Sequence, residues 1–271
     1  KEQAGSLPDP VMIAADLHVH TTNSDGTLAP SAVVPAARAA GLSAVAVTDH
    51  DRLHPGLDAP VVERDGVTLV HGIELRVAAG DQRVDLLGYG ARRTDALTAA
   101  VDRLQRDRMA RGRAIVDLVE DRLGIDLDVT IEPGFGRPDV ARAVAAHPDT
   151  DYDPKGVFVD LIGDGKPCYV ARDVPSFDRG RSLLADACDL VGLAHPFRYD
   201  DPEAALALTE HLDAVERWYP YHHDVDPAPV DRAIATHDLV PTGGSDAHDE
   251  TLGVAGLAQD AWESVRAVLD G

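Results

Sequence analysis

The chain has 271 residues, and its 47 acidic residues against 25 lysines and arginines give a formal net charge of −22 at pH 7. So large a negative charge repels nucleic-acid backbones and anionic membranes, so neither long nucleic acid nor a membrane is an expected partner. The apolar runs are far shorter than the ~20 residues that span a bilayer. The two cysteines show no disulfide framework, which predicts a cytoplasmic protein.

Residues 1–10 lack the apolar core of a signal peptide and are interpreted as a lead-in segment. Residues 11–271 are expected to form one main domain, because barrel folds of about 250 residues commonly do so. Up to residue 90, short apolar runs alternate with helical segments, which is typical of successive βα units. Strands are predicted over residues 12–17, 43–48 and 68–73, and a helix is predicted over residues 30–40.

The alternation of strand and helix patterns stops near Thr94, where Leu97, Val101 and Leu104 recur at helical spacing. One long helix is predicted to run from there to Gly124, followed by helices over residues 138–146 and 157–163. We interpret residues 91–174 as a mostly helical insertion packed over the mouth of a barrel. Alternation then resumes, with strands predicted over residues 190–194, 214–217 and 239–242 and helices over residues 202–211, 227–236 and 260–269.

His18 and His20 stand two residues apart at the end of the first predicted strand. Because side chains alternate between the faces of a strand, both imidazoles project from the same face and can hold a cation. Taken alone, such a pair is more often exposed to solvent, and the cluster Thr-Asp-His-Asp at residues 48–51 is more often a turn or helix cap. The argument rests on repetition, since potential metal ligands also follow three further predicted strands. These residues are Glu74, His195, Asp246 and His248.

Short motifs at these positions, in this order, resemble those of the PHP (polymerase and histidinol phosphatase) family. They are Asp-Leu-His-Val-His-Thr at 16–21, Thr-Asp-His-Asp at 48–51, Gly-Ile-Glu at 72–74, Ala-His-Pro at 194–196 and Ser-Asp-Ala-His at 245–248. Residues 163–167 and 215–220 also resemble segments of the family's stand-alone metal-dependent phosphoesterases, which include nucleoside 3',5'-bisphosphate phosphatases. The resemblance implies an α/β fold, a distorted (βα)7 TIM-like barrel over residues 11–271, with residues 91–174 as an inserted helical cap.

The resemblance also implies two or three divalent metal ions, of manganese, iron or zinc, and residues that bind them. By position, the first ion would be bound by His18, His20, Glu74 and Asp246. The second would share Glu74 and bind His195, and the third would be bound by Asp25, His50 and His248. Mixed imidazole and carboxylate ligands suit these metals, and a metal pair lowers the pKa of a bridging water and neutralises phosphate charge.

Two residues depart from the family pattern. Asp85 stands where related phosphoesterases usually supply a histidine to the second metal, and a carboxylate there could still bind it while making bound water less acidic. Asp139 stands where the subgroup often has a histidine, and it could be the catalytic proton donor only with a raised pKa. These differences leave open an altered metal preference, a different substrate or a loss of activity.

Phosphate recognition favours arginine and lysine near the metals. Arg198, three residues after His195, is the first candidate for binding substrate, followed by Arg137 and Lys166 in the insertion. Ordinary surface ion pairs are the alternative for each. The arginine-rich run at residues 103–113 is interleaved with aspartates, and we interpret it as a solvated helix face from which one arginine could reach the mouth.

Two further candidates follow the strand predicted at residues 214–217. Tyr219 could stack on a base, and His222 could protonate a leaving oxygen as a catalytic residue. For His222, a solvated loop residue is the slightly favoured interpretation.

The leading hypothesis is a metal-dependent phosphatase that hydrolyses a small phosphomonoester, such as a nucleoside 3',5'-bisphosphate. Such an anionic substrate is compatible with the acidic chain, because bound divalent cations make the mouth locally positive. Cyclic phosphodiesters and short oligonucleotides are alternatives within the same chemistry. A catalytically silent metal-binding module is a second hypothesis. A third is an amidohydrolase-like enzyme acting on a C–N bond, which the lack of an obvious lysine for carboxylation at a strand end disfavours.

Overall fold

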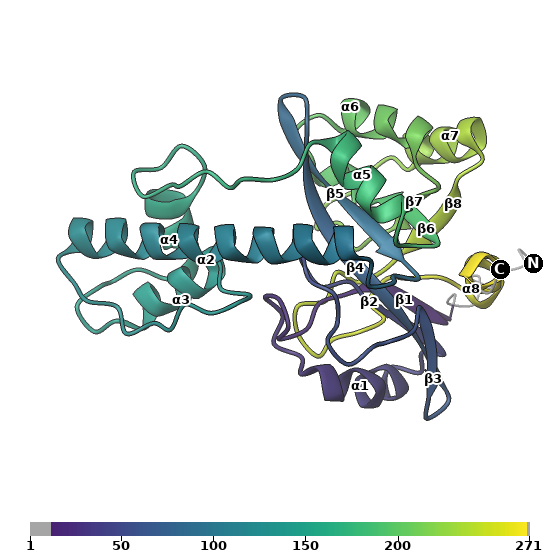
Figure 1. Cartoon of the computed structure of the whole chain (residues 1–271), viewed down its shortest axis with the longest axis horizontal. Helices are drawn as coiled ribbons and strands as arrows, with labels where there is room; N and C mark the ends of the chain where they lie inside the picture. Colours follow the sequence, from purple (N-terminus) through teal and green to yellow (C-terminus); the bar gives the residue numbers. More distant parts are fainter. Residues whose placement is uncertain (1–11, 270–271) are drawn as a thin grey trace, which may run out of the picture.

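A curled sheet organises residues 12–269, which are the residues described by the computed structural model. The predicted lead-in segment at residues 1–10 lies outside them. Seven strands run in the order β1-β2-β4-β5-β6-β7-β8, and β3 pairs with β4 beside this path. Figure 1 shows helices α1, α5, α6 and α7 packed around the strands. The strands are β1 (Ala15–Val19), β2 (Ala44–Val47), β3 (Val61–Arg64), β4 (Val67–Ala79), β5 (Gln82–Tyr89), β6 (Leu190–Leu193), β7 (Ala214–Trp218) and β8 (Val240–Gly243).

Most neighbouring strands are parallel. Strands β1, β2 and β4 run in one direction, as do β6, β7 and β8, but β5 is antiparallel to both β4 and β6. The predicted α/β class is therefore confirmed. The chain departs from a regular series of βα units, because β4 turns directly into β5 through Gly80, whose φ is 62°. The strand predicted over residues 68–73 is too short, since pairing with β5 extends β4 to Ala79.

The outer strands β1 and β8 approach one another closely. A Cβ on Gly244, directly after β8, would lie 2.3 Å from the backbone nitrogen of His18, so this approach requires glycine. A parallel bridge joins Val19 to Ala247. The contact brings the ends of β1 and β8 together, and with them the histidines and carboxylates at these ends.

The helices that flank the sheet begin at recognisable sequence signals. Ser176 and Asp201 cap their helices by accepting hydrogen bonds from the backbone N–H groups of Arg179 and Ala204. The helices predicted at residues 30–40, 202–211, 227–236 and 260–269 are all present. Their bounds are η1 (Pro30–Ala32) with α1 (Val33–Ala39), α6 (Pro202–Ala207) with η4 (Leu208–His211), α7 (Ala228–His237) and α8 (Gln259–Leu269), and the flanking set is completed by α5 (Phe177–Ala185) and η3 (Pro196–Arg198).

Four helical elements lie between β5 and α5 in the described chain: α2 (Asp95–Leu123), α3 (Arg137–Ala146), α4 (Pro154–Val157) and η2 (Phe158–Ile162). Thr94 caps α2, and Gly124, with φ of 68°, ends it. The first half of α2 packs into the core that covers β4 and β5, through Leu97 and Leu104. Its second half joins α3 and η2 in a separate apolar cluster, which projects away from the strands at the left of Figure 1.

No helix within residues 12–269 is both long enough and apolar enough to cross a membrane. The longest helix, α2, instead packs inside the protein through its buried apolar side chains, which are Leu97, Val101, Leu104, Ile115, Val116 and Val119.

His71 on β4 is buried within the fold, with 1% of its surface exposed. Its Nε2 has no hydrogen-bond partner among the described residues. Burial, reinforced by the positive charges of Arg93 and His54, lowers the pKa of His71 to about 4. The fold therefore accommodates the neutral imidazole.

We expect acid to destabilise the protein partly through His71. Its pKa is about 4 in the folded chain and 6.5 ordinarily, so the unfolded state takes up a proton first as the pH falls, and stability present above pH 6.5 is lost on acidification. This linkage corresponds to about 2 kcal/mol between pH 7 and pH 5. Urea unfolding of His71→Gln should show a smaller loss over this interval, whereas exposed His223→Gln should follow the wild type. Parallel pH profiles for His71→Gln and the wild type would contradict this assignment.

Candidate metal centre

The nine side chains predicted as metal ligands lie together at the end of the curled sheet. They form four overlapping groups, which we call the metal-type groups. Within each group, one ligand atom per residue lies within 4.8 Å of the others. The groups are His20 with Asp25, His50 and His248; His18 with His20 and Glu74; His18 with His195 and Asp246; and Glu74 with Asp85 and His195. The structure therefore brings together residues that are far apart in the chain.

Glu74 lies at the centre of these groups and is fully buried. Its Oε1 is 3.0 Å from Nε2 of His195 and 3.4 Å from Nε2 of His18. Its Oε2 is 2.7 Å from Nδ1 of His50 and 3.4 Å from Nε2 of His20. Glu74 does not follow the end of a strand, as the sequence suggested, but lies in the middle of β4. Its two oxygens thus face two pairs of histidines.

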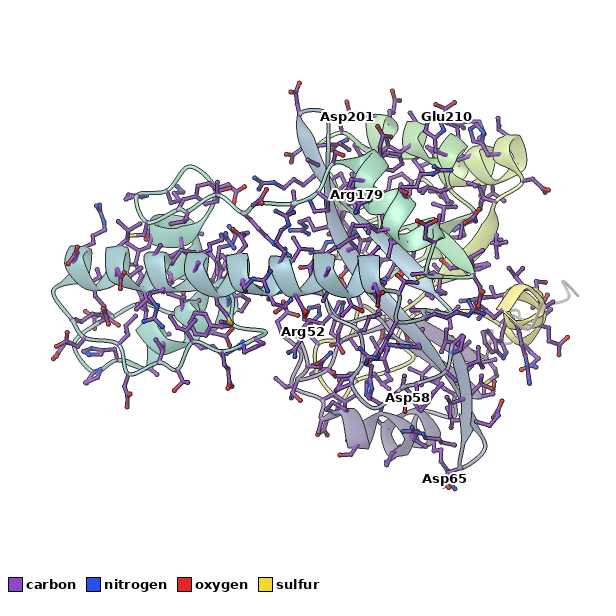
Figure 2. All side chains as sticks on the ribbon, viewed as in Figure 1. Arg52, Asp58, Asp65, Arg179, Asp201 and Glu210 are labelled. Atoms are coloured by element: carbon purple, nitrogen blue, oxygen red, sulfur yellow. The ribbon has the colours of Figure 1, made fainter. Side chains whose placement is uncertain are left out.

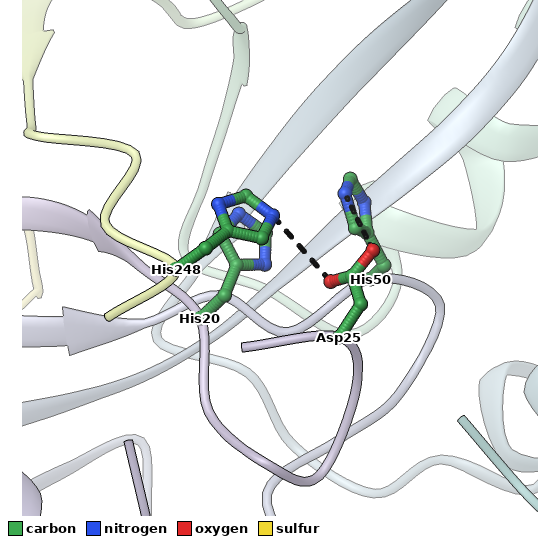
Figure 3. Close-up of side chains that lie close together, drawn as sticks. All are labelled: His20, Asp25, His50 and His248. Carbon is green, nitrogen blue, oxygen red and sulfur yellow. Dashed lines mark ion pairs between the residues drawn. The ribbon is translucent and has the colours of Figure 1, made fainter. Parts of the chain in front are cut away.

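An outer group is formed by His20, Asp25, His50 and His248 (Figure 3). Oδ1 of Asp25 lies 3.5 Å from Nε2 of His248, and Oδ2 lies 3.9 Å from Nε2 of His50. The rings of His20 and His248 stack with their centroids 4.2 Å apart. Asp25 is thereby placed between the imidazoles of His50 and His248, which come from two other segments of the chain.

Asp49 organises the loop that carries Asp25. Its carboxylate accepts hydrogen bonds from the backbone N–H and hydroxyl of Thr21, from the side-chain amide of Asn23 and from the hydroxyl of Ser24. The Thr-Asp-His-Asp cluster therefore has a divided role. Asp49 holds the neighbouring loop, as a turn residue does, while His50 faces the outer group.

Asp246 connects the inner and outer groups. Its Oδ1 lies 3.1 Å from Nε2 of His20 and 3.5 Å from Nε2 of His18. Its Oδ2 accepts hydrogen bonds from Arg198 at 2.7 Å and from the hydroxyl of Tyr219 at 2.8 Å. Arg198 and Tyr219, both predicted to contact substrate, thus hold one oxygen of Asp246 and leave the other facing the histidines.

Two of these residues have a backbone conformation that non-glycine residues rarely adopt. The φ angle is 26° at His195 and 50° at Asp246. Such conformations carry a local energy cost and persist where the surroundings hold them, which is common at functional sites.

Glu216 on β7 contacts two of the predicted metal ligands, and the sequence interpretation did not assign it. It is 1% exposed and accepts hydrogen bonds from Nδ1 of His18 at 3.0 Å and from the backbone N–H of His195 at 2.7 Å. Because a carboxylate only accepts, Nδ1 of His18 carries a proton, and this hydrogen bond directs Nε2 toward Glu74 and Asp246. The available signal was a carboxylate at an inward position of the apolar strand predicted at residues 214–217.

The charges of the centre stabilise one another. Burial opposes ionisation of Glu74, but the positive charges of His50 and His18 outweigh it and hold the pKa of Glu74 well below its usual range. Burial likewise opposes ionisation of Asp25 and Asp246, and neighbouring imidazolium charges lower the pKa of both carboxyls. The carboxylates are therefore ionised at neutral pH, which suits the binding of cations.

The residues present fit divalent metal ions. Within residues 12–269, several buried ligand atoms lack a well-formed hydrogen bond, and these atoms face one another across the centre. They are Nε2 of His18, Nε2 of His20, Oδ1 of Asp25, Nδ1 of His50 and Oε2 of Glu74. Imidazole nitrogens and carboxylate oxygens in such a mixture suit manganese, iron or zinc.

A hollow of about 160 Å³ opens beside the outer group, with Asp25 and His50 in its wall. Arg108 reaches Oδ2 of Asp25 at 3.5 Å. Burial lowers the pKa of both Arg111 and Arg172 to about 10, so both are still charged at neutral pH. The arginines that line this hollow are Arg76, Arg83, Arg108, Arg111, Arg137 and Arg172. Such a lining suits the binding of a small anion.

A second hollow, of about 580 Å³, lies on the Asp85 side of the centre. It shares Arg76, Arg83 and Arg137 with the first and adds Arg198 and His195. Of the predicted substrate residues, Arg137 thus lines both hollows. The run at residues 103–113 contributes two arginines to the first hollow, Arg108 and Arg111, so it is more than a solvated helix face.

The remaining predicted residues lie elsewhere. Asp139 caps α3, because its Oδ2 accepts from the backbone N–H of Gly136 at 2.7 Å and its Oδ1 accepts from Arg142 at 2.6 Å. Both oxygens are thus engaged at the start of that helix, apart from the four metal-type groups. Lys166 and His222 are exposed and line neither arginine-rich hollow.

Comparison with known proteins agrees with this geometry. The model of the PHP domain family matches residues 16–133. The chain is 32% identical over 248 residues to the phosphoribosyl 1,2-cyclic phosphate 1,2-diphosphodiesterase of Eggerthella lenta, covering 86% of this chain and 93% of that protein. It is 29% identical over 205 residues to the 3',5'-nucleoside bisphosphate phosphatase of Chromobacterium violaceum, covering 70% and 69% of the two chains.

The fold is also similar to that of a solved structure. A crystal structure from Bifidobacterium adolescentis, of a protein assigned as a metal-dependent phosphoesterase, superposes with a TM-score of 0.75 at 23% identity, covering 94% of this chain and 96% of that one. The chain belongs to the PHP domain family.

We expect Glu216→Gln to weaken metal binding about 10- to 100-fold, because the amide no longer holds Nδ1 of His18 as a carboxylate does. Equilibrium titration with Mn²⁺ would measure the change. The matched control is Glu210→Gln, since Glu210 is exposed near α6 at the outer edge of the molecule (Figure 2). Affinity within twofold of the wild type for both variants would show that Glu216 does not orient a metal ligand.

Proposed function

We propose that this protein hydrolyses a small phosphate ester that carries a second anionic group, with a nucleoside 3',5'-bisphosphate as the leading substrate. Its class is that of metal-dependent phosphoester hydrolases. The observation that carries the proposal is the position of the arginine-lined hollow, whose wall includes two members of the outer metal-type group, Asp25 and His50.

We assign eight side chains of these groups as metal ligands, with Glu74 shared at the centre. They are His18, His20, Asp25, His50, Glu74, His195, Asp246 and His248. When bound there, divalent ions supply activation of water and neutralisation of phosphate charge. The protein's own residues prepare the site. Glu216 fixes the orientation of His18, and Arg198 and Tyr219 hold Asp246 so that its Oδ1 faces His20.

The arginines bind and orient the substrate in this proposal. An arginine presents a rigid planar fork of donors that matches a phosphate group, and several such forks in a sheltered hollow favour a dianion. With the scissile phosphate at the metal-type groups, the second anionic group lies toward Arg108, Arg111 and Arg137. The small volume of this hollow and the net charge of −22 favour a small substrate over long nucleic acid.

A cyclic phosphodiester is the second candidate substrate. The Eggerthella lenta relative, named as a cyclic phosphate diphosphodiesterase, matches more of this chain than the bisphosphate phosphatase does. A sugar cyclic phosphate that also carries a terminal phosphate would place its second anionic group in the same hollow. Both candidates therefore require the same arginines and differ in the ester at the metal-type groups.

We expect the Mn²⁺-loaded protein to release phosphate from adenosine 3',5'-bisphosphate at least tenfold more efficiently than from adenosine 3'-monophosphate, because the second phosphate gains charge-assisted hydrogen bonds. Phosphoribosyl 1,2-cyclic phosphate and a 5'-phosphorylated dinucleotide would be compared in the same assay of kcat/KM. A variant carrying His18→Ala and His20→Ala should be inactive. Full metal loading without turnover of any of these esters would favour a silent metal-binding module.

Arg137 offers a sharper test of substrate recognition. We expect Arg137→Gln to lower kcat/KM for the bisphosphate about 10- to 100-fold and to leave the monophosphate less affected, since one charge-assisted contact to the second phosphate is lost. Arg142→Gln, on the same helix but paired with Asp139 at its N-terminal end, is the control. An equal loss on both substrates would argue against a separate subsite for the second phosphate.

A further inference from the structure

Asp85 differs from the other members of the metal-type groups because both of its carboxylate oxygens already have strong partners. It is fully buried on β5. Nε of Arg76 donates to its Oδ1 at 2.7 Å, and Nη2 of Arg76 donates to its Oδ2 at 2.5 Å. This side-on, bidentate ion pair is among the strongest hydrogen-bonded contacts between side chains. By contrast, the distance from Asp85 to Nε2 of His195 is 3.8 Å.

Asp85 is not among the members of the centre that have unpartnered buried atoms. Within residues 12–269, such atoms belong to His18, His20, Asp25, His50, Glu74 and His195, and neither oxygen of Asp85 is among them. A buried polar atom without a partner is costly, so these atoms mark where a cation is required. At Asp85 the positive charge is already supplied by the protein.

The backbone around Asp85 is also fixed. Its N–H donates to the hydroxyl of Tyr199 at 2.8 Å, and that hydroxyl donates to the carbonyl of Ala194 at 3.0 Å. These hydrogen bonds hold the backbone of Asp85, and the bidentate pair with Arg76 holds its side chain. A divalent ion on the same carboxylate would in addition face the permanent positive charge of the guanidinium.

Arg76 itself has a second use. The side-on pair occupies one edge of the guanidinium, and the edge formed by Nη1 and Nη2 retains donors for another partner. The Arg76 side chain is 34% exposed and lines both arginine-rich hollows. It can therefore neutralise Asp85 on one edge and bind a phosphate oxygen on the other.

We propose that Arg76, held by Asp85, takes the place of one metal ion, so that this protein binds two divalent ions and uses a guanidinium as the third cation of its centre. The proposal rests on the proposed function for its phosphate-binding part, but the number of metal ions can be measured independently of turnover. In this proposal, the aspartate at position 85 determines that the third cation is an arginine and not a metal ion.

The first test is metal stoichiometry, measured by equilibrium dialysis against Mn²⁺ followed by elemental analysis of the full chain. We expect two Mn²⁺ per wild-type chain and two per Asp85→Asn chain. Three ions on the wild type, or the loss of one ion in Asp85→Asn, would overturn the proposal. The wild-type count requires no variant to fold.

The second test restores a histidine at this position. The double variant Arg76→Gln/Asp85→His removes the resident charge and supplies an imidazole, and we expect it to bind a third Mn²⁺, whereas Arg76→Lys should retain two. A folded double variant that still binds two ions would count against the proposal. Circular dichroism and thermal unfolding establish that each variant is folded.

The third test concerns the outer edge of Arg76 and uses inorganic phosphate as the probe. We expect Arg76→Lys to bind phosphate about tenfold more weakly than the wild type while retaining two Mn²⁺. A lysine ammonium group cannot make a bidentate pair with Asp85 and bind phosphate through a second edge at the same time. Unchanged phosphate affinity would exclude Arg76 from anion binding. Two Mn²⁺ without hydrolysis of any ester would refute the proposed function alone, and hydrolysis with three Mn²⁺ would refute this inference alone.

Discussion

The buried carboxylate of Glu74 is the feature on which the site and much of the fold depend. An isolated charge in this position would be very costly, and it is tolerated because four imidazoles from three other segments surround it. His18 and His20 come from β1 and its end, His50 follows β2, and His195 follows β6. These segments can meet only if the sheet curls around β4. The curvature of the sheet is thus what allows these imidazoles to surround one buried carboxylate.

The distribution of charge separates long-range from local behaviour. The chain as a whole is strongly acidic, yet arginines converge on a hollow from the sheet, from α2, from α3 and from the segment before α5. Distant anions experience the negative surface, which salt screens within about 10 Å. An anion inside the hollow experiences the arginines, in surroundings that water screens less. A small phosphate ester that fits inside the hollow is therefore attracted by the arginines, whereas an extended polyanion would be repelled by the negative surface.

The sequence predicted well what depends on short-range periodicity. The long helix to Gly124 and most strand starts follow from apolar spacing, and His18 and His20 share a face because strands alternate. It predicted poorly what depends on pairing between strands. Strand β5 was not predicted, and neither was the extension of β4 past Glu74, because both depend on the antiparallel pairing of β4 with β5. The capping role of Asp139 and the burial of Glu216 likewise depend on neighbours that the sequence does not place in advance.

The path of α2 has a consequence for folding energetics. One half of this helix belongs to the apolar core over β4 and β5, and the other half belongs to the separate cluster with α3 and η2. The arginines of the hollow come from both sides of this division. An anion held by them is therefore a ligand of the assembled pair of cores and of neither core alone. Its binding free energy is linked to the cooperativity between them, so the substrate itself would help to couple two units that could otherwise unfold at different stabilities.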